Sequence, residues 1–545
     1  MSRSHRDCEK CHIVSTTALR LAAIRSGQRT LGAGASRGRS VVTAATSMQP
    51  GTAAPSIRLA SRWTVVRSAG PQLMLAVGAF SLYADLSMAR YRHMDAGIDL
   101  AIFGQAVRNY AHWQLPWSNI KAIAGFNLLG DHFSPVVALA APAYWLVPHV
   151  WVLLIVQAGL IAGTTFLITR VVARHLGQGA GLLIGSIYAL AWGTQGLALF
   201  DFHEVAFALP LVAMSYLRLL EGRDRSAVLW AMPLMLVKED CVFLLLGLAL
   251  VLLARRQVKL AAATAGYAVG TFALIVGVII PHSSYYGRYT YWSSSAAGGN
   301  FVSRSFTDLV HAFSSGQAPH LLVVLLLPTL GLALRSPLML GVIPPLLSRW
   351  TSPDPTYWGA EYHYNATITV IVMVALADAV SRLGRRRLTR PLLVVGLTAT
   401  VVMSLSAPVG RLLTTLHDSR CGDCGSRISE VLGLVPDGAR VTAADYAASY
   451  LVDRTTVIGL HEHFVDSTGQ PIDPDYVVVE DPHTQGWQTG WFASQAPETE
   501  YHLLGEAVRL QQPGLRDYDI GVFAAGPLMP GPPAGPNQHQ AGQGG

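Results

Sequence analysis

AVLWAMPLMLVKEDCVFLLLGLALVLLA, residues 227–254, decides how the chain is folded, because three charged residues interrupt an apolar run. A single helix across a membrane would bury Lys238, Glu239 and Asp240 near its middle. It would also export the basic residues that follow, against the positive-inside rule: Arg255, Arg256, Lys259, Arg382, Arg385, Arg386, Arg387 and Arg390. We therefore predict two short helices that turn at Lys238 to Asp240, an arrangement tolerated where it lines a cavity rather than lipid.

The whole chain has the composition of an α-helical polytopic membrane protein. Of its 545 residues 51% are hydrophobic and 13% charged, and its mean hydropathy is +0.36. Since a crossing helix needs about 20 apolar residues, the runs and the charges of their loops give about eleven crossings. The predicted crossings are 72–89, 148–169, 180–199, 205–220, two within 227–254, 260–280, 320–334, 337–347, 366–381 and 391–408. They form a transmembrane domain, 61–408, with outer loops 90–133, 282–319 and 348–365.

The two ends of the chain differ from this domain. Residues 1–60 hold nine Lys and Arg against two Asp and Glu, and we predict a disordered basic tail in the cytoplasm. The remaining charges balance, so no nucleic-acid partner is expected. An odd number of crossings places residues 409–525 outside the cytoplasm as a small α/β domain. Its strands are expected at 439–443, 455–459 and 476–480, and its helices near 426–434 and 498–510. Residues 526–545 are rich in Pro and Gly and are expected to be disordered.

Four polar clusters fall at the outer ends of the predicted crossings. They are Asp131-His132, Asp201-Phe-His-Glu204, Lys238-Glu-Asp240 and Glu361-Tyr-His363. Ionisable groups near membrane depth are costly and mark wet cavities or substrate paths. Because all four clusters reach the same side, we predict one site that opens away from the cytoplasm.

The residue types in these clusters suit two kinds of ligand. Asp131, Asp201 and Glu204 could hold a divalent cation, magnesium or manganese. Ammonium and imidazole groups could instead bind a phosphate. Each cluster also has a structural alternative: an aspartate can cap a helix, a Lys–Glu pair can pin a hairpin, and aromatic residues can form an interface belt.

Asp99 follows the first crossing, in Gly97-Ile-Asp-Leu-Ala-Ile-Phe-Gly-Gln105. A carboxylate at this outer position could accept a proton from an attacking hydroxyl group. A helix cap at the membrane surface is the alternative explanation.

Taken together, these motifs resemble the bacterial membrane family called domain of unknown function 2079. The resemblance spans about residues 75–480 and rests on Asp99-Leu with Gln105, Gly130-Asp-His-Phe-Ser-Pro135, Phe200-Asp-Phe-His203, Val237-Lys-Glu-Asp240 and His363-Tyr-Asn365. That family is similar to the GT-C membrane glycosyltransferases, which take a sugar from a polyprenyl-phosphate donor and use an aspartate of the first outer loop as base. This chain departs from the family pattern at Ala101, usually Gly, and at Glu204, usually Pro.

The resemblance implies a GT-C-like protein of the bacterial plasma membrane that acts in the cell envelope. Asp99 would be the catalytic base, and residues around the donor phosphate would be Lys238, His132, His203, Arg108, Glu239, Asp240 and His363, with Arg288 as a further candidate. The implied partners are a polyprenyl-phosphate-linked sugar, membrane lipid, and a glycan, lipid or protein acceptor. A transporter or flippase for a lipid-linked or anionic substrate remains an alternative, and so does a non-catalytic scaffold. A carrier would place its charges halfway across the membrane.

Overall fold

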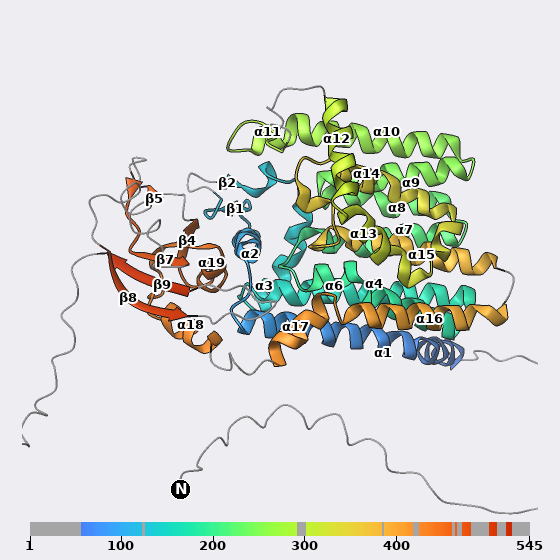
Figure 1. Ribbon diagram of the computed structural model, residues 1–545, viewed down its shortest axis with the longest axis horizontal. Coiled ribbons are helices and arrows are strands. Elements are labelled where there is room, and N and C mark those ends of the chain that lie inside the picture. Colours follow the sequence, from blue (N-terminus) through green and yellow to red (C-terminus); the bar gives the residue numbers. More distant parts are fainter. Residues whose placement is uncertain are drawn as a thin grey trace, which may run out of the picture. The chain divides into compact units, whose positions relative to one another are not determined.

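The computed structural model describes most of the chain, and Figure 1 labels its elements. The described residues are 56–121, 126–291, 301–383, 386–417, 424–459, 464–465, 471–480, 501–508 and 519–525. The first helix begins at Ser56, within the predicted tail 1–60. The rest of that tail and the tail 526–545 lie outside the described residues.

Helices make up most of residues 56–417, and several of the long ones run along a common direction (Figure 1). The longer helices are α1 (Ser56–Arg92), α4 (Val152–Leu176), α5 (Gln178–Leu190), α7 (Ala208–Leu220), α9 (Val242–Ala254), α10 (Val258–Leu274), α12 (Phe301–Ser314), α13 (Gln317–Leu326), α15 (Ala366–Arg382) and α16 (Arg386–Ser404). Shorter α-helices are α6 (Trp192–Ala198), α8 (Asp224–Ala231), α11 (Ile280–Ser283), α14 (Ile343–Trp350) and α17 (Pro408–His417). Short 3-10 and π turns join them: η3 (Glu204–Phe207), η4 (Met232–Leu236), η5 (Glu239–Cys241), η6 (Ile275–Ile279), η8 (Leu327–Thr329), η9 (Leu332–Arg335), η10 (Pro337–Val342), η11 (Pro355–Tyr357) and η12 (His363–Asn365).

Five described helices are long and apolar enough to cross a membrane. They are Ala69–Arg92, Val152–Leu176, Val258–Ser283, His363–Arg382 and Arg387–Ser404. The bent pair Val302–Ser314 and Gln317–Thr329 would make six if it is one broken span. The other predicted crossings fall on shorter helices, so the number eleven stays a prediction.

The run 227–254 is divided, as its charges predict. α8 and η4 occupy its first half, and α9 its second half. Between them Lys238 has an extended backbone (φ −165°, ψ 148°), so the helix stops there. Pro233 in η4 also removes a backbone donor, which weakens a continuous helix at this position.

Residues 98–146 lie across one end of the bundle, beside the sheet (Figure 1). They comprise α2 (Ile98–Ala111), β1 (Trp117–Ser118), β2 (Phe126–Asn127), η1 (Leu128–Gly130), η2 (Pro135–Ala140) and α3 (Ala141–Leu146). α2 is amphipathic: Leu100, Ala106 and Val107 are buried, while Arg108 is exposed. It therefore rests on the bundle as a surface helix rather than crossing it.

The carboxyl-terminal residues form a five-stranded mixed sheet in the order β4-β3-β7-β9-β8. Its strands are β3 (Arg440–Ala443), β4 (Thr456–Gly459), β7 (Tyr476–Glu480), β8 (Tyr501–Val508) and β9 (Asp519–Ala525). β3 is parallel to β4 and β7, and β9 is antiparallel to β7 and β8. α18 (Cys424–Leu432) and α19 (Asp445–Leu451) accompany the sheet, and β5 (Phe464–Val465) pairs separately with β6 (Pro471–Ile472).

The helix predicted near residues 498–510 is wrong. Residues Tyr501–Val508 form β8, which pairs with β9 from Tyr501 to Val508 around a bulge between Leu503 and Gly505. Glu, Leu and Ala favour a helix here, but pairing along a whole neighbouring strand outweighs so weak a local preference.

This sheet domain is attached to the bundle mainly through α2 and the residues just before it. The Tyr450 hydroxyl accepts a hydrogen bond from Ala96 N (2.8 Å), and Ser449 Oγ donates to Gly97 O (2.6 Å). Gln105 Nε2 donates to Val457 O of β4 (3.0 Å). The sheet domain thus fixes both ends of the segment that carries Asp99.

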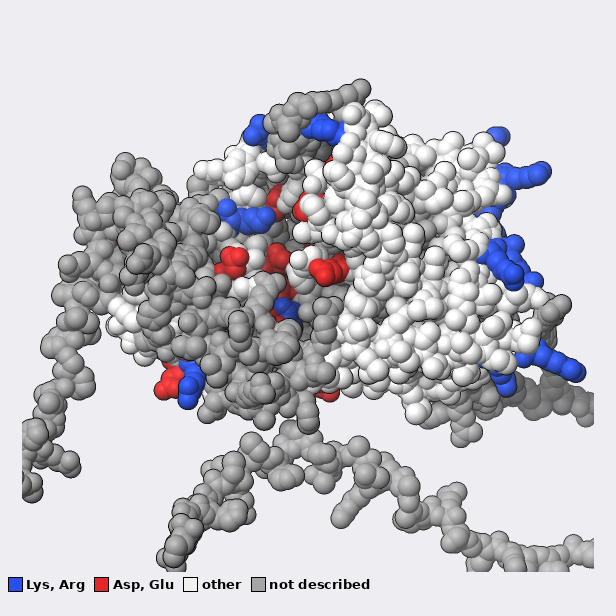
Figure 2. Space-filling view, in the orientation of Figure 1, with Lys and Arg blue, Asp and Glu red and all other residues white. Residues whose placement is uncertain are grey.

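Lys and Arg side chains gather at the end of the bundle away from the sheet, on the right of Figure 2. Basic residues end several helices: Arg174, Arg218, Arg255 and Arg382. At the other end the same view shows Asp and Glu side chains inside a hollow. The end away from the sheet therefore exposes mainly basic side chains, whereas the hollow holds acidic side chains together with basic ones.

Candidate active site

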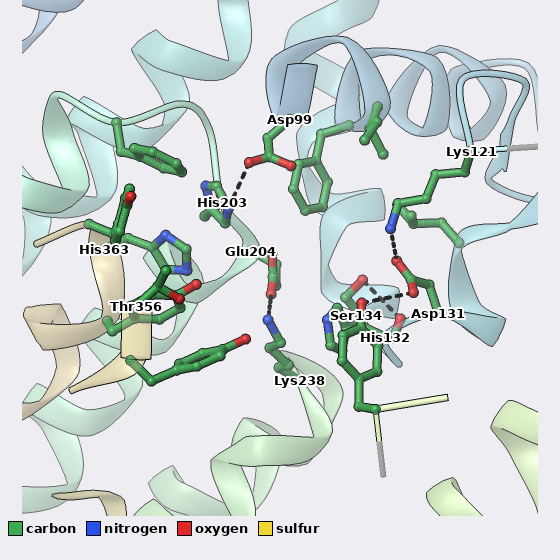
Figure 3. Close-up of a pocket in the computed structure, with 18 residues that line it drawn as sticks. Asp99, Lys121, Asp131, His132, Ser134, His203, Glu204, Lys238, Thr356 and His363 are labelled. Carbon is green, nitrogen blue, oxygen red and sulfur yellow. Dashed lines mark hydrogen bonds and ion pairs between the residues drawn. The ribbon is translucent and has the colours of Figure 1, made fainter. Parts of the chain in front are cut away.

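A cavity of about 250 Å³ lies at the sheet-facing end of the bundle, where Figure 2 shows the hollow. Figure 3 shows the side chains that line it. Its walls come from α2, from the loops around β2 and η3, from the break before α9 and from the segment that precedes α15. The polar residues in the wall are Asp99, Lys121, Asp131, His132, Ser134, His203, Glu204, Lys238, Thr356 and His363, and the aromatic ones are Phe103, Phe200, Tyr291, Tyr357, Tyr362 and Tyr364. Segments far apart in the sequence therefore contribute to one chamber.

Asp99 is held at the cavity by contacts beneath the start of α2. Asp201 accepts a hydrogen bond from Gly97 N (3.0 Å) and pairs with Arg90 (3.2 Å). A Cβ atom on Gly97 would lie 2.5 Å from Asp201 Oδ2, so only glycine permits this approach. Arg90 also pairs with Asp95 (2.9 Å). This network fixes the first turn of α2, and with it Asp99.

His203 lies beside Asp99, with Nε2 3.6 Å from Asp99 Oδ2 (Figure 3). His203 Nδ1 is 3.3 Å from the Asp201 carbonyl oxygen, which can only accept, so Nδ1 carries a proton. Burial raises the pKa of Asp99 above its ordinary value, although the charge of His203 opposes this shift. The carboxylate of Asp99 is therefore more basic than that of a solvated aspartate.

His363 stacks on His203 with ring centroids 3.8 Å apart. His363 is buried, and neither of its ring nitrogens has a hydrogen-bond partner among the described residues. Tyr362, just before it, has φ 60° and ψ −166°, a strained backbone for a non-glycine residue. Buried Arg349 holds this segment by donating to Gly359 O (2.7 Å) and to Asn365 Oδ1 (2.5 Å). The strained backbone of Tyr362 and the unpaired ring nitrogens of His363 thus lie together in the cavity wall.

Lys238 is not a free cation, because its ammonium group lies 3.0 Å from Glu204 Oε1. Burial disfavours the charged form of Glu204, but the attraction of Lys238 outweighs it and lowers the pKa of Glu204 to about 2. The pair is thus ionised across the physiological pH range. An ammonium group has three donors, so Lys238 can still bind an oxygen of a ligand.

His132 is oriented by Glu239, a buried carboxylate outside the cavity wall. His132 Nδ1 is 2.6 Å from Glu239 Oε1, and Glu239 Oε2 accepts from Phe133 N (3.0 Å). Burial opposes ionisation of Glu239, but His132 lowers its pKa. The other face of the pair is closed by Tyr291, whose ring stacks on His132 at 4.3 Å. Nε2 of His132 therefore remains available to a ligand in the cavity.

Asp131 is paired on the same side of the cavity. Lys121 Nζ lies 2.7 Å from Asp131 Oδ2, and the Tyr291 hydroxyl donates to Asp131 Oδ1 (2.9 Å). Burial works against ionisation, but His132 and Lys121 lower the pKa of Asp131. Its carboxylate oxygens are therefore both occupied by donors of the protein.

The three predicted cation ligands are not brought together. Asp131 pairs with Lys121, Glu204 with Lys238, and Asp201 with Arg90 outside the cavity wall. Within the described residues no group of three or more His, Cys, Asp or Glu side chains could hold a metal ion. The residues present thus do not fit a magnesium or manganese centre built from this set.

Seven of the residues predicted for the site line the cavity: Asp99, Asp131, His132, His203, Glu204, Lys238 and His363. Glu239 and Asp201 act behind the wall through His132 and Gly97. Asp240 is exposed beyond the wall, and Arg108 lines a different cavity. Exposed Arg288 lines neither of these cavities. The side chains of Asp240, Arg108 and Arg288 therefore do not line the chamber.

Sequence analysis missed Lys121, Tyr291 and Tyr357, and it assigned no role in the site to Tyr362 of the cluster Glu361-Tyr-His363. Lys121 is in an irregular loop after β1, where no motif marks it. The tyrosines gave one usable signal, since three occur within the short segment 357–364 beside Glu361 and His363.

Comparison with protein families gives a clear result for this arrangement. The model of the family described as "Predicted membrane protein (DUF2079)" matches residues 90–501. The chain belongs to this family. The matched region contains the cavity and most of the sheet domain, as the resemblance of the motifs predicted.

Two solved structures are similar to the chain. ArnT from Cupriavidus metallidurans bound to undecaprenyl phosphate has 13% sequence identity and a TM-score of 0.48, over 86% of this chain and all of that one. The arabinofuranosyltransferase AftD from Mycobacteria has 16% identity and a TM-score of 0.43, over 83% of this chain but only 40% of its own length. No match was found among curated proteins.

Proposed function

We propose that the chain is an integral membrane glycosyltransferase, which moves a sugar from a polyprenyl-phosphate donor to an acceptor outside the cytoplasm of a bacterial cell. The observation that carries the proposal is the chamber itself. In it the Asp99 carboxylate lies beside the stacked imidazoles of His203 and His363, and the ammonium group of Lys238 lines the same wall, paired with Glu204. A base for a hydroxyl and donors for a leaving phosphate are what a glycosyl transfer from a phosphate requires.

The orientation follows from the charges at the two ends of the bundle. The basic residues that gather at one end of the bundle support a cytoplasmic position for that end, and so an outer position for the chamber (Figure 2). A site at the end of the bundle suits chemistry at the membrane surface, whereas a carrier would have its site near the midplane. A polyprenyl donor could reach such a chamber with its tail still in lipid.

In this reaction Asp99 accepts the proton of the acceptor hydroxyl group. The acceptor oxygen forms a bond to the anomeric carbon, and the bond from that carbon to the phosphate oxygen breaks, with its electron pair leaving on the phosphate. The configuration of the anomeric carbon inverts. Its raised pKa makes Asp99 a better base than a solvated aspartate.

The leaving phosphate gains negative charge, and the chamber offers donors for it. Lys238 keeps spare N–H donors, and His132 and His363 have ring nitrogens not used by the protein. Because Lys238 and Glu204 neutralise each other, this pair adds no net charge to the chamber before the donor binds. In a buried site such prearranged donors stabilise developing charge better than water does.

The test is Asp99→Asn in cells, with polyprenyl-phosphate sugars and surface glycans measured by mass spectrometry. We expect the lipid-linked sugar to accumulate and a surface glycan to lose it. Asp224→Asn is the matched control, because Asp224 pairs with Arg255 (3.0 Å) remote from the chamber and should leave both pools unchanged. Normal lipid and glycan pools in Asp99→Asn cells, at wild-type protein levels, would refute the proposal.

A further inference from the structure

A second cavity, of about 370 Å³, separates α2 from the edge of the sheet domain. α2 contributes Gln105, Arg108 and Asn109 to it, and His112 follows directly after the helix. The sheet domain contributes Val452, Thr455, Thr456 and Val457. Gln114, Trp117 and Asn119 complete the wall. Since each residue turns a helix by about 100°, this lining lies on a different face of α2 from Asp99.

The fold uses the side chains of Gln105 and Thr455, but within the described residues several other hydrogen-bonding groups of this wall are left over. The Arg108 guanidinium makes one long bond, to Val452 O (3.4 Å). Asn109 donates to Trp117 O (2.9 Å), which leaves its amide oxygen open, and His112 Nδ1 bonds Arg108 O (2.7 Å), which leaves Nε2 open. No side-chain bond within the described residues engages Gln114, Asn119 or Thr456. The wall therefore offers many donors and acceptors around an exposed indole, Trp117.

Amide, hydroxyl and guanidinium groups beside an aromatic ring form the surface that a saccharide needs, with hydroxyls to bond and one apolar face to stack. A peptide added to the edge of β4 is the competing occupant. However, the carbonyl of Val457 on that edge is already taken by Gln105 Nε2 (3.0 Å). The lining thus favours a saccharide over an added strand.

The segment 117–121 contributes side chains to the walls of both cavities. Trp117 and Asn119 line the second cavity, and Lys121, two residues further, lines the chamber of Asp99. From Asp99 to Arg108, α2 rises by about 14 Å, which is farther than one sugar ring spans. A ligand that reaches both cavities must therefore have at least two sugar units.

We propose that the second cavity binds the distal units of an oligosaccharide acceptor whose terminal hydroxyl enters the chamber at Asp99. The role of the saccharide as an acceptor rests on the proposed function. Its binding in the second cavity does not. The substrate class is accordingly a saccharide of two or more units rather than a single sugar, a lipid or a polypeptide.

The test is binding of soluble mono- to tetrasaccharides of hexoses, N-acetylhexosamines and uronic acids to the full chain in lipid nanodiscs, without any donor. At least one di- to tetrasaccharide should bind, and the matching monosaccharide should bind more weakly. Arg108→Gln should weaken binding by about tenfold, the loss expected for one charged hydrogen bond. Thr456→Val should weaken it less, and Arg288→Gln, an exposed arginine outside both cavities, should not change it.

Three results would overturn the inference: no binding of any saccharide with two or more units, binding that Arg108→Gln and Thr456→Val leave unchanged, or binding of an extended peptide instead. Thermal unfolding of each variant shows whether it is still folded. Thr456→Val is a mild change, because valine has nearly the shape of threonine. If Asp99→Asn cells accumulate the lipid-linked sugar but no saccharide binds, this inference alone fails. If those cells are normal but saccharides bind through Arg108, the proposed function fails and the binding site stands.

Discussion

Ion pairs occur at both ends of the helical bundle, in opposite surroundings. Lys238 and Glu204 lie 3.0 Å apart with 12% and 2% of their side chains exposed, whereas Arg223 and Glu221 lie 3.7 Å apart with 65% and 16% exposed. An exposed pair costs little to form and contributes little. Burial of an ion pair removes the hydration of two charges, a cost that a pair of apolar side chains does not have. Stability alone therefore does not explain why Lys238 and Glu204 are buried. The buried pair is thus better explained by a ligand, and the exposed pair by membrane topology.

The largest effect is expected when one member of the buried pair is removed. Lys238→Met leaves the Glu204 carboxylate buried without its partner, and a broken buried pair costs about 3–5 kcal/mol. Thermal or denaturant unfolding in nanodiscs measures this loss. The double variant Lys238→Met with Glu204→Gln should regain most of the stability, because no unpaired charge remains, but it should not regain transferase activity. Full stability in the single variant would contradict the account of this pair.

A smaller effect is expected when the orientation of His132 is disturbed. Glu239→Gln removes the charge that holds the imidazole at 2.6 Å but keeps an acceptor oxygen. The neutral amide holds the imidazole less strongly than the carboxylate does, so kcat should fall by about tenfold, the loss expected for one charged hydrogen bond. Separate measurement of kcat and KM distinguishes this role from a merely structural one, since kcat should fall while KM and the free energy of unfolding stay close to those of the wild type. An unchanged kcat would show that Glu239 only supports the fold.

The pH dependence of the reaction reports on Asp99. The base must be ionised, and burial raises its pKa, so kcat/KM should fall on acidification at a higher pH than an ordinary aspartate would give. The charge of His203 lowers the pKa of Asp99, and His203→Gln should move the acidic limb to still higher pH. If His203→Gln lowered kcat/KM by the same factor at every pH, the coupling between His203 and Asp99 would be contradicted.

Much of the bundle could be predicted because its signals are local. The break at Lys238 follows from charges inside one apolar run, and the strands β3, β4 and β7 follow from short alternating segments. β8 could not be predicted, since its pairing with β9 is a property of the assembled sheet. The number of crossings stays a prediction, because several helices are shorter than a full span.

The polar clusters of the site could also be predicted, because each is a short local motif. The ion-pair partner of each residue could not be predicted. Asp201 and Glu204 lie three residues apart, yet one faces Arg90 behind the wall and the other faces Lys238 in the chamber. This choice depends on the direction of each side chain in the folded loop. Lys121 was invisible, because nothing in a loop sequence shows that it will reach Asp131.

The smallest effect is expected at the opposite end of the bundle. Arg223 is largely exposed and 3.7 Å from Glu221, which is paired more closely with Arg218 (2.5 Å). Arg223→Gln should therefore change the free energy of unfolding by less than about 1 kcal/mol, and raised salt, which screens exposed charges, should reduce that difference further. The same salt should leave the cost of Lys238→Met nearly unchanged, because the buried pair is shielded from ions. If both variants responded to salt alike, the two ends of the bundle would not differ in the way their exposure indicates.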